Sequence, residues 1–190
     1  MSPAAVFLPY QSGWIEDPAQ VKLWEKSRRI GASFCEAADN VLHAASGKGN
    51  VGYISYAKDM TENYIADCAS WAKKFDKAAG EIGESIFTRD DDRDIHVFDI
   101  RFASGNFIKA FSNNPRNLRS FGRPGDIVVI DEAAFVDDLS ELLKAAMAVT
   151  MWGGKVRIMS THNGAANPFN NLIEDIRKGR YQFNLHRTDL

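Results

Sequence analysis

The chain lacks an excess of charge of either sign. It carries 23 Lys and Arg residues against 25 Asp and Glu residues, for a formal net charge of −2 at pH 7. This balance excludes a global basic field that would attract nucleic acid, so any contact with DNA must come from a local patch or from several subunits together. Cysteine is also scarce, with only Cys35 and Cys68. They offer no disulfide framework and no metal-site spacing, which favours a reducing compartment.

Long apolar runs are missing as well. The longest are far shorter than the ~18 consecutive residues typical of a membrane span, so we expect no contact with a membrane. Residues 1–11 lack a basic region followed by a long apolar core, so we expect no secretory signal. The length of 190 residues predicts one domain, and 45% hydrophobic residues allow a sizeable core.

The most informative stretch is residues 126–135, Asp-Ile-Val-Val-Ile-Asp-Glu-Ala-Ala-Phe. The apolar run 127–130 predicts a strand buried on both faces of a parallel sheet. Asp131 and Glu132 then lie at its carboxyl end, where open α/β sheets bind their ligands. Consecutive strand residues point to opposite sides, so one acid can hold Mg²⁺ while the other reaches a water beside a phosphate. This is the Walker B arrangement of nucleotide hydrolases; an N-cap for the next helix is the alternative.

A second stretch, residues 26–33, partly matches the phosphate loop G-x-x-x-x-G-K-[ST]. Gly31 and Ser33 match the last glycine and the hydroxyl of that pattern. Lys26 stands where the first glycine is expected, and Ala32 occupies the usual lysine position. The chemistry can survive if Lys26 supplies the positive charge to the phosphates from the other end of the loop. The alternative is a basic loop on a solvated surface.

The flanks of this loop carry weaker signals. Asp17-Pro18 is a helix-start pattern, so we expect a short helix over residues 19–25 and no long apolar strand before Lys26. A helix over residues 34–45 would direct its N-terminal amides toward an anion.

Patterns elsewhere predict further elements. We expect strands over residues 51–55, 95–102, 107–111, 155–159 and 181–185, and helices over residues 60–75, 138–147 and 168–178. The polar stretch 81–94, including Asp90-Asp91-Asp92, is interpreted as solvated.

Two polar segments could contact ligands. Arg116, Arg119 and Arg123 form the best basic patch; they could contact DNA phosphates or a neighbouring subunit, or be ordinary surface arginines. The turn 160–164 follows the strand 155–159 at the sheet edge expected for Asp131. Its hydroxyl and amide groups could sense a γ-phosphate, although such residues are common in turns.

Gln11, the basic loop 26–33, the Asp-Glu strand and the Ser-Thr turn occur in an order that resembles the ATPase domain of the large terminase subunit of tailed bacteriophages. The resemblance covers nearly the whole chain and is nearest to the Mu-like and lambda-like branches, whose deviant Walker A motif carries its lysine at the start of the loop. It implies an α/β fold of the P-loop NTPase (RecA/ASCE-like) type, with a mostly parallel central sheet and helices on both faces.

The resemblance also implies roles in binding ATP. Gln11 would read the adenine and Lys26 would contact the phosphates. The rest of the implied nucleotide-binding loop is Ser27, Ile30, Gly31, Ala32 and Ser33.

The implied catalytic and coupling residues lie near the phosphates. Ser33 and Asp131 would hold Mg²⁺, and Glu132 would activate water. Arg28 or Arg29 would respond to the γ-phosphate. The coupling motif that links hydrolysis to movement would be Ser160, Thr161 and His162.

As a whole, the resemblance implies a motor that couples ATP hydrolysis to translocation of double-stranded DNA into a procapsid. Expected partners are a portal protein, a small terminase subunit and further copies of the chain in a ring, in the cytoplasm of the bacterial host. Residues 1–190 would be the ATPase domain, without the C-terminal nuclease domain of the family. Two alternatives are a helicase-like DNA translocase and a nucleotide-binding regulatory module without hydrolysis; the altered loop favours the latter and the Asp-Glu pair opposes it.

Overall fold

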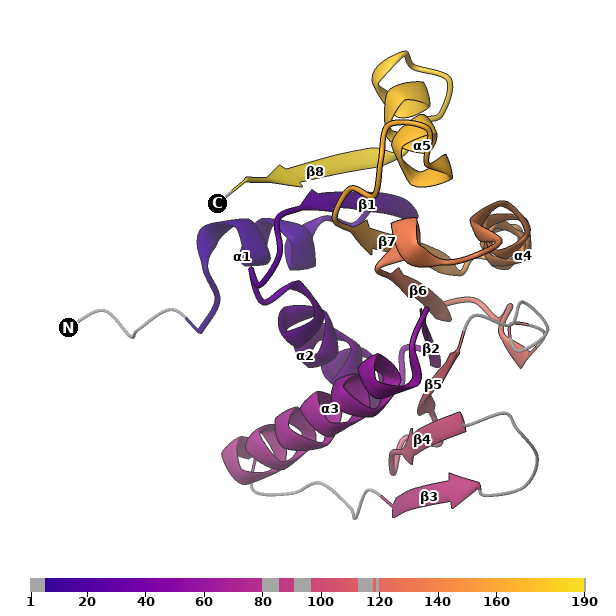
Figure 1. Ribbon diagram of the computed structural model, residues 1–190. Helices are drawn as coiled ribbons and strands as arrows, with labels where there is room; N and C mark the ends of the chain where they lie inside the picture. The colour runs from indigo at the N-terminus through magenta and orange to yellow at the C-terminus, as the bar shows by residue number, and fades with distance from the viewer. Residues whose placement is uncertain (1–5, 80–85, 91–96, 113–117, 119, 190) are drawn as a thin grey trace.

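A single mixed sheet forms the centre of the protein in the computed structural model of the chain (Figure 1). The structure describes residues 6–79, 86–90, 97–112, 118 and 120–189. Within these ranges the sheet has eight strands in the order β3-β4-β5-β2-β6-β7-β1-β8.

Parallel pairing dominates this sheet. Six neighbouring strands run parallel: β5 (Phe107–Ser112), β2 (Val51–Ser55), β6 (Ile127–Asp131), β7 (Lys155–Ser160), β1 (Val21–Lys26) and β8 (Asn184–Thr188). The antiparallel strands β4 (Val97–Arg101) and β3 (Ile86–Asp90) extend one edge. All five residues of β6 are buried, as its apolar run predicts.

Helices cover both faces of the sheet (Figure 1). One face carries α1 (Pro9–Glu16), α2 (Ala32–Ala45) and α3 (Lys58–Ala79), and the other carries α4 (Leu139–Thr150) and α5 (Pro168–Arg177). A short 3-10 turn, η2 (Ala133–Phe135), follows β6. Strand alternation sends Trp24 into the core under α1 to α3 and Leu23 into the core under α4 and α5. The predicted fold class is confirmed.

The helix predicted over residues 19–25 is wrong, because these residues mostly form β1. All six residues of this strand are buried. Its polar residues make it look unlike a buried strand in the sequence, but Lys22 and Glu25 have bonding partners in the folded chain. Lys22 donates to the main-chain oxygens of Trp14 and Asp17, and Glu25 is paired with two basic side chains described below.

Other boundaries differ by a few residues. The helix expected from residue 34 begins at Ala32, and the strand expected over 181–185 is β8, three residues later. The polar stretch 81–94 contains β3, which was not predicted. Asp91, Asp92, Arg116 and Arg119 lie outside the described residues.

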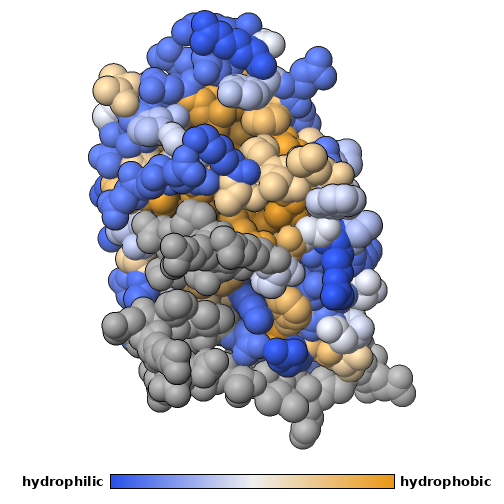
Figure 2. All heavy atoms as spheres, turned by 90° about the vertical axis from the view of Figure 1, so that its right-hand side faces the viewer, coloured by the Kyte–Doolittle hydropathy of each residue, from blue (hydrophilic) through white to orange (hydrophobic). Residues whose placement is uncertain are grey.

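Figure 2 views the face that carries α4 and α5, where apolar side chains lie among hydrophilic ones. A groove of about 340 Å³ lies between these helices and the segment before β8. It is lined mainly by apolar side chains, including Leu143, Met147, Leu172 and Phe183. Among the described residues, no helix has the length and apolar character that crossing a membrane requires.

Candidate active site

The loop between β1 and α2 depends on a glycine at its end. Gly31 is the N-cap of α2 and has a φ of 69°, in the left-handed region that side chains with a Cβ rarely adopt. A Cβ at this position would lie 2.8 Å from the Gln11 Nε2 atom. The match of Gly31 to the last glycine of the phosphate-loop pattern therefore has a structural basis.

Gln11 contacts the main chain of this loop. Its Nε2 donates to the carbonyl oxygens of Ile30 at 3.0 Å and Gly31 at 3.3 Å, and its Oε1 accepts from the Leu8 amide at 2.9 Å. Both ends of the amide are thus engaged within the protein. An adenine nitrogen that accepts from Nε2 would have to replace one of the two carbonyl oxygens, whereas Oε1 keeps a second lone pair for an adenine amino group. The adenine-reading role of Gln11 stays a prediction.

Lys26, at the end of β1, and Glu132, directly after β6, meet although these two strands are not neighbours. The Lys26 Nζ lies 2.6 Å from Glu132 Oε1, and the two side chains are only 5% and 17% exposed. Because β7 lies between β1 and β6, the strand ends that carry these residues are roughly 10 Å apart. The long side chains close this gap above the end of β7. The structure therefore brings the predicted phosphate-binding lysine to the predicted Asp-Glu pair.

Glu132 diverges from Asp131 for a different reason than predicted. Strand β6 ends at Asp131, and Glu132 has a φ of 50°, so a left-handed turn rather than strand alternation separates the two carboxylates. Among the described non-glycine residues, only Glu132 and Arg29 have a positive φ. Both lie in this site, and strained backbone of this kind is concentrated at functional sites.

The Asp131 carboxylate is held on both oxygens. Its Oδ1 accepts from the Glu132 amide at 2.8 Å, and its Oδ2 accepts from the hydroxyls of Ser33 and, at 2.7 Å, Tyr53. Burial raises the pKa of Asp131 above its ordinary value, while the charge of Lys26 and the two hydroxyl donors act in the opposite direction. Ser33 and Asp131 are thus brought together as predicted.

Tyr53 was missed by the sequence analysis. Burial and the neighbouring Asp131 raise the pKa of Tyr53 well above its usual value, so its hydroxyl stays protonated and acts as the donor. A tyrosine in the otherwise apolar stretch 51–54 was the available signal. It became informative only once β2 was known to pair with β6.

The turn after β7 contacts the other oxygen of Glu132. Glu132 Oε2 lies 3.3 Å from the Thr161 amide nitrogen and 3.4 Å from the Ser160 Oγ. His162 turns toward β1 instead, where its Nε2 lies 2.7 Å from Glu25 Oε1, and Arg177 of α5 bonds the second Glu25 oxygen. Ser160 and Thr161 thus lie at the site, whereas His162 connects it to β1 and α5.

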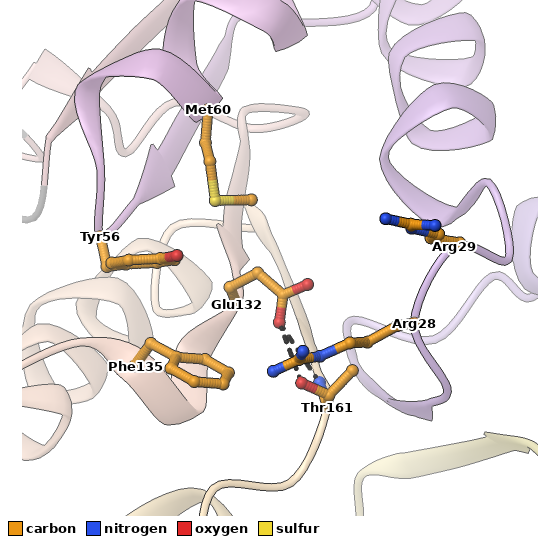
Figure 3. A pocket seen from close by; sticks show the side chains of 7 residues that line it. All are labelled: Arg28, Arg29, Tyr56, Met60, Glu132, Phe135 and Thr161. Carbon is orange, nitrogen blue, oxygen red and sulfur yellow. Dashed lines mark hydrogen bonds between the residues drawn. The ribbon is translucent and has the colours of Figure 1, made fainter.

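A pocket of about 320 Å³ opens beside Glu132 (Figure 3). Arg28 and Arg29 lie on one side of it and the aromatic pair Tyr56 and Phe135 on the other. Its lining residues are Arg28, Arg29, Tyr56, Met60, Glu132, Phe135 and Thr161. Arg28 extends toward Thr161, and Arg29 lies farther to the side. The two arginines are thus at the site, and no described contact distinguishes their predicted roles.

The arrangement combines an anion site with a base. The start of α2 and the Lys26 ammonium favour a phosphate, and the Glu132 carboxylate can accept a proton from water. Ser33 and Asp131 offer neighbouring oxygen donors, which are the ligands that Mg²⁺ prefers. No cluster of three or more His, Cys, Asp or Glu side chains fit for a metal occurs in the part of the chain that the structure describes. A Mg²⁺ ion here would complete its shell with phosphate oxygens and water, which is its usual mode of binding.

Residues 23–182 match the family described as "Terminase large subunit, T4likevirus-type, N-terminal". The chain is 50% identical over 192 residues to the Mu-like prophage FluMu protein gp28 of Haemophilus influenzae, covering 99% of this chain and 37% of that protein. It is 47% identical over 192 residues to the probable terminase, large subunit gp28, of Escherichia phage Mu, covering 97% of this chain and 34% of that protein. The chain therefore spans little more than a third of the length of these relatives.

Solved structures share the fold at low sequence identity. The ATPase domain of the Thermus phage P74-26 large terminase has a TM-score of 0.62 and 19% identity, covering 94% of this chain and 79% of that chain. The large terminase of a thermophilic bacteriophage in complex with ADP has a TM-score of 0.61 and 16% identity, covering 96% of this chain and 45% of that chain.

Proposed function

This chain belongs to the terminase large-subunit family of the T4-like virus type, whose N-terminal region it matches, and on that premise we propose that it is an ATP-hydrolysing motor domain. In this proposal it couples ATP hydrolysis to translocation of double-stranded DNA into a phage procapsid. The observation that carries the proposal is the convergence of Lys26, Ser33, Asp131 and Glu132 at the carboxyl end of a parallel sheet. A related protein with ADP bound supports the choice of nucleotide.

Binding of ATP is assigned to the loop after β1. The amides of residues 27–33 and the Lys26 ammonium would cradle the phosphates, with Ala32 at the first turn of α2. Gln11 donates to two carbonyl oxygens of this loop and would read the adenine after exchanging one of these partners.

Hydrolysis is assigned to Glu132. Its carboxylate would take a proton from a water whose oxygen attacks the γ-phosphorus, while the bond to the β-phosphate oxygen breaks and leaves ADP and phosphate. Arg28 or Arg29 would stabilise the charge on the γ-phosphate. Ser33 and Asp131 would hold Mg²⁺, which neutralises phosphate charge when bound.

Coupling to movement is assigned to the turn after β7. Ser160 and Thr161 contact the proposed base, and His162 transmits their position to Glu25 and Arg177. A change at the γ-phosphate would therefore reach strand β1 and helix α5. We propose that the motor acts in the host cytoplasm as a ring of copies, with the portal protein and a small terminase subunit as partners.

The test is phosphate release from ATP by the chain with Mg²⁺, measured with and without double-stranded DNA. We expect Mg²⁺-dependent hydrolysis that Glu132→Gln abolishes. Nucleotide binding without any hydrolysis, even with DNA and assembly partners present, would instead support a regulatory module. Stimulation by single-stranded but not double-stranded DNA would support a helicase-like translocase.

A further inference from the structure

Tyr53 carries a hydroxyl that packing alone does not require. The residue lies in the middle of β2, is 1% exposed, and donates to Asp131 Oδ2 at 2.7 Å. A buried hydroxyl costs free energy unless a partner compensates for its lost water. Phenylalanine would fill the same space between the sheet and α3 without that cost. The hydroxyl therefore acts on Asp131.

The bond from Tyr53 is independent of what binds in the site. Asp131 Oδ2 also accepts from Ser33, but Ser33 is partly exposed and is itself a proposed Mg²⁺ ligand. The Glu132 amide holds the other carboxylate oxygen, Oδ1. Of the two described donors to Asp131 Oδ2, Tyr53 is thus the one without a proposed role in binding Mg²⁺ or nucleotide.

The ring of Tyr53 is fixed in turn by its neighbours. It stacks on Tyr64 of α3, with 3.6 Å between ring centroids and 5° between planes. The Tyr64 hydroxyl accepts from Asn40 Nδ2 at 2.7 Å. Both tyrosines are about equally buried, so the Tyr53 hydroxyl approaches Asp131 from a buried stack of two rings.

We propose that Tyr53 is a positioning residue, whose hydroxyl holds the Asp131 carboxylate in the orientation that binds Mg²⁺ together with ATP. This inference rests on the proposed function and names a residue that the phosphate-loop and Asp-Glu motifs do not contain. Hydrogen-bond donors behind a metal-binding carboxylate commonly change metal affinity by about 10- to 100-fold.

The test compares Tyr53→Phe with Tyr64→Phe as a matched control. Both variants retain the stacked rings and lose one buried hydroxyl, but only the first loses a bond to Asp131. Binding of a fluorescent, non-hydrolysable ATP analogue is titrated with Mg²⁺ and repeated in EDTA. We expect Tyr53→Phe to need at least about tenfold more Mg²⁺ for half-maximal binding of the analogue. Its affinity for the analogue in EDTA should be unchanged. Tyr64→Phe should keep the Mg²⁺ midpoint of the parent chain.

An equal Mg²⁺ midpoint in Tyr53→Phe and the parent, or an equal shift in Tyr64→Phe, would overturn the inference. A second measurement avoids any loss of folding: a ring-fluorinated tyrosine is placed at 53 or at 64. Addition of Mg²⁺ to the nucleotide complex should move the fluorine NMR resonance at 53 and leave that at 64; an unmoved resonance at 53 contradicts the proposal. A parent chain that binds no analogue would overturn the proposed function as well, whereas the other negative results leave that function intact.

Discussion

Lys26 and Glu132 form an ion pair with 2.6 Å between Nζ and Oε1, across the end of the intervening strand β7. The proposed phosphate ligand and the proposed base therefore contact each other directly. A triphosphate that takes the Lys26 ammonium competes with the Glu132 carboxylate for this charge. In the proposed function, binding of ATP and release of Glu132 as the base would therefore be linked through one side chain.

Replacement of Glu132 by glutamine should separate binding from hydrolysis. Glutamine cannot accept the proton of the attacking water, and it leaves the Lys26 charge available to the phosphates. We expect nucleotide affinity equal to or above that of the parent, with single-turnover hydrolysis at least about 100-fold slower. The control is Glu141→Gln, an exposed acid on α4 paired with Lys144. A single-turnover rate close to the parent rate would rule out Glu132 as the base.

Replacement of Lys26 by alanine should weaken nucleotide binding. A hydrogen bond from a charged donor is worth about 1.5–3 kcal/mol, so we expect a loss of affinity of at least about tenfold. Equilibrium titration with a fluorescent ATP analogue measures this. Lys48→Ala is the control, because Lys48 is exposed in the turn after α2. Equal affinities of Lys26→Ala and the parent would show that the loop binds phosphate without this lysine.

Replacement of Glu25 by glutamine should disturb the turn that contacts the base. Glu25 bonds His162 with one carboxylate oxygen and Arg177 with the other. We expect the free energy of unfolding in urea to fall by about 1–3 kcal/mol, which is the usual cost of leaving a buried hydrogen-bonding group without its partner. We also expect slower single-turnover hydrolysis, because Thr161 precedes His162 directly. Glu174→Gln, an exposed acid on α5 paired with Lys178, is the control; normal hydrolysis and stability in Glu25→Gln would disprove the link.

Replacement of Arg157 by methionine should destabilise the fold in a pH-dependent way. Arg157 bonds Glu36 at 2.7 Å in the core between β7 and α2. Burial alone would raise the pKa of Glu36, but the charges of Arg157 and Lys22 and hydrogen bonds outweigh it, so the net pKa is lowered. A carboxyl group with a lowered folded-state pKa stabilises the fold above its ordinary value of 4.5 and loses this effect as the pH falls through the folded-state pKa.

At neutral pH we therefore expect Arg157→Met to lower the free energy of unfolding by about 3–5 kcal/mol, because Glu36 is left buried without its charge partner. The penalty should shrink in acid, where Glu36 becomes protonated. Urea unfolding over an acid-to-neutral pH series measures both effects. Arg180→Met, whose side chain is 66% exposed, should change little. A penalty independent of pH would assign the effect to lost packing rather than to the uncompensated carboxylate.

Local chemistry was sufficient to predict much of the site. The apolar run before Asp131 marked a central strand, and Gly31 and Ser33 marked the start of a helix beside it. Parallel strands place their carboxyl ends at one edge, so the position of Asp131 followed from its strand, whereas the meeting of Lys26, Ser33 and Asp131 was implied by the resemblance to terminases. The contacts confirm that they meet; their roles in catalysis stay predictions.

Other features depend on tertiary partners that no local pattern contains. Strand β1 was missed because Lys22 and Glu25 look exposed in the sequence, and their burial requires Trp14, Asp17, His162 and Arg177. Tyr53 was missed because its hydroxyl matters only when β2 lies beside β6. The turn at Glu132 was also not predicted, since a positive φ is uncommon for glutamate.

The side chains of this site come from distant parts of the sequence, and this has a consequence for folding. Lys26 and Glu132 are 106 residues apart, and Ser33 and Asp131 are 98 apart. Contacts of such separation form late, because chain entropy opposes them until much of the sheet has assembled. A newly made or partly unfolded chain therefore does not bring these four side chains together. In the proposed function, the fold itself would restrict ATP hydrolysis to molecules that have finished folding.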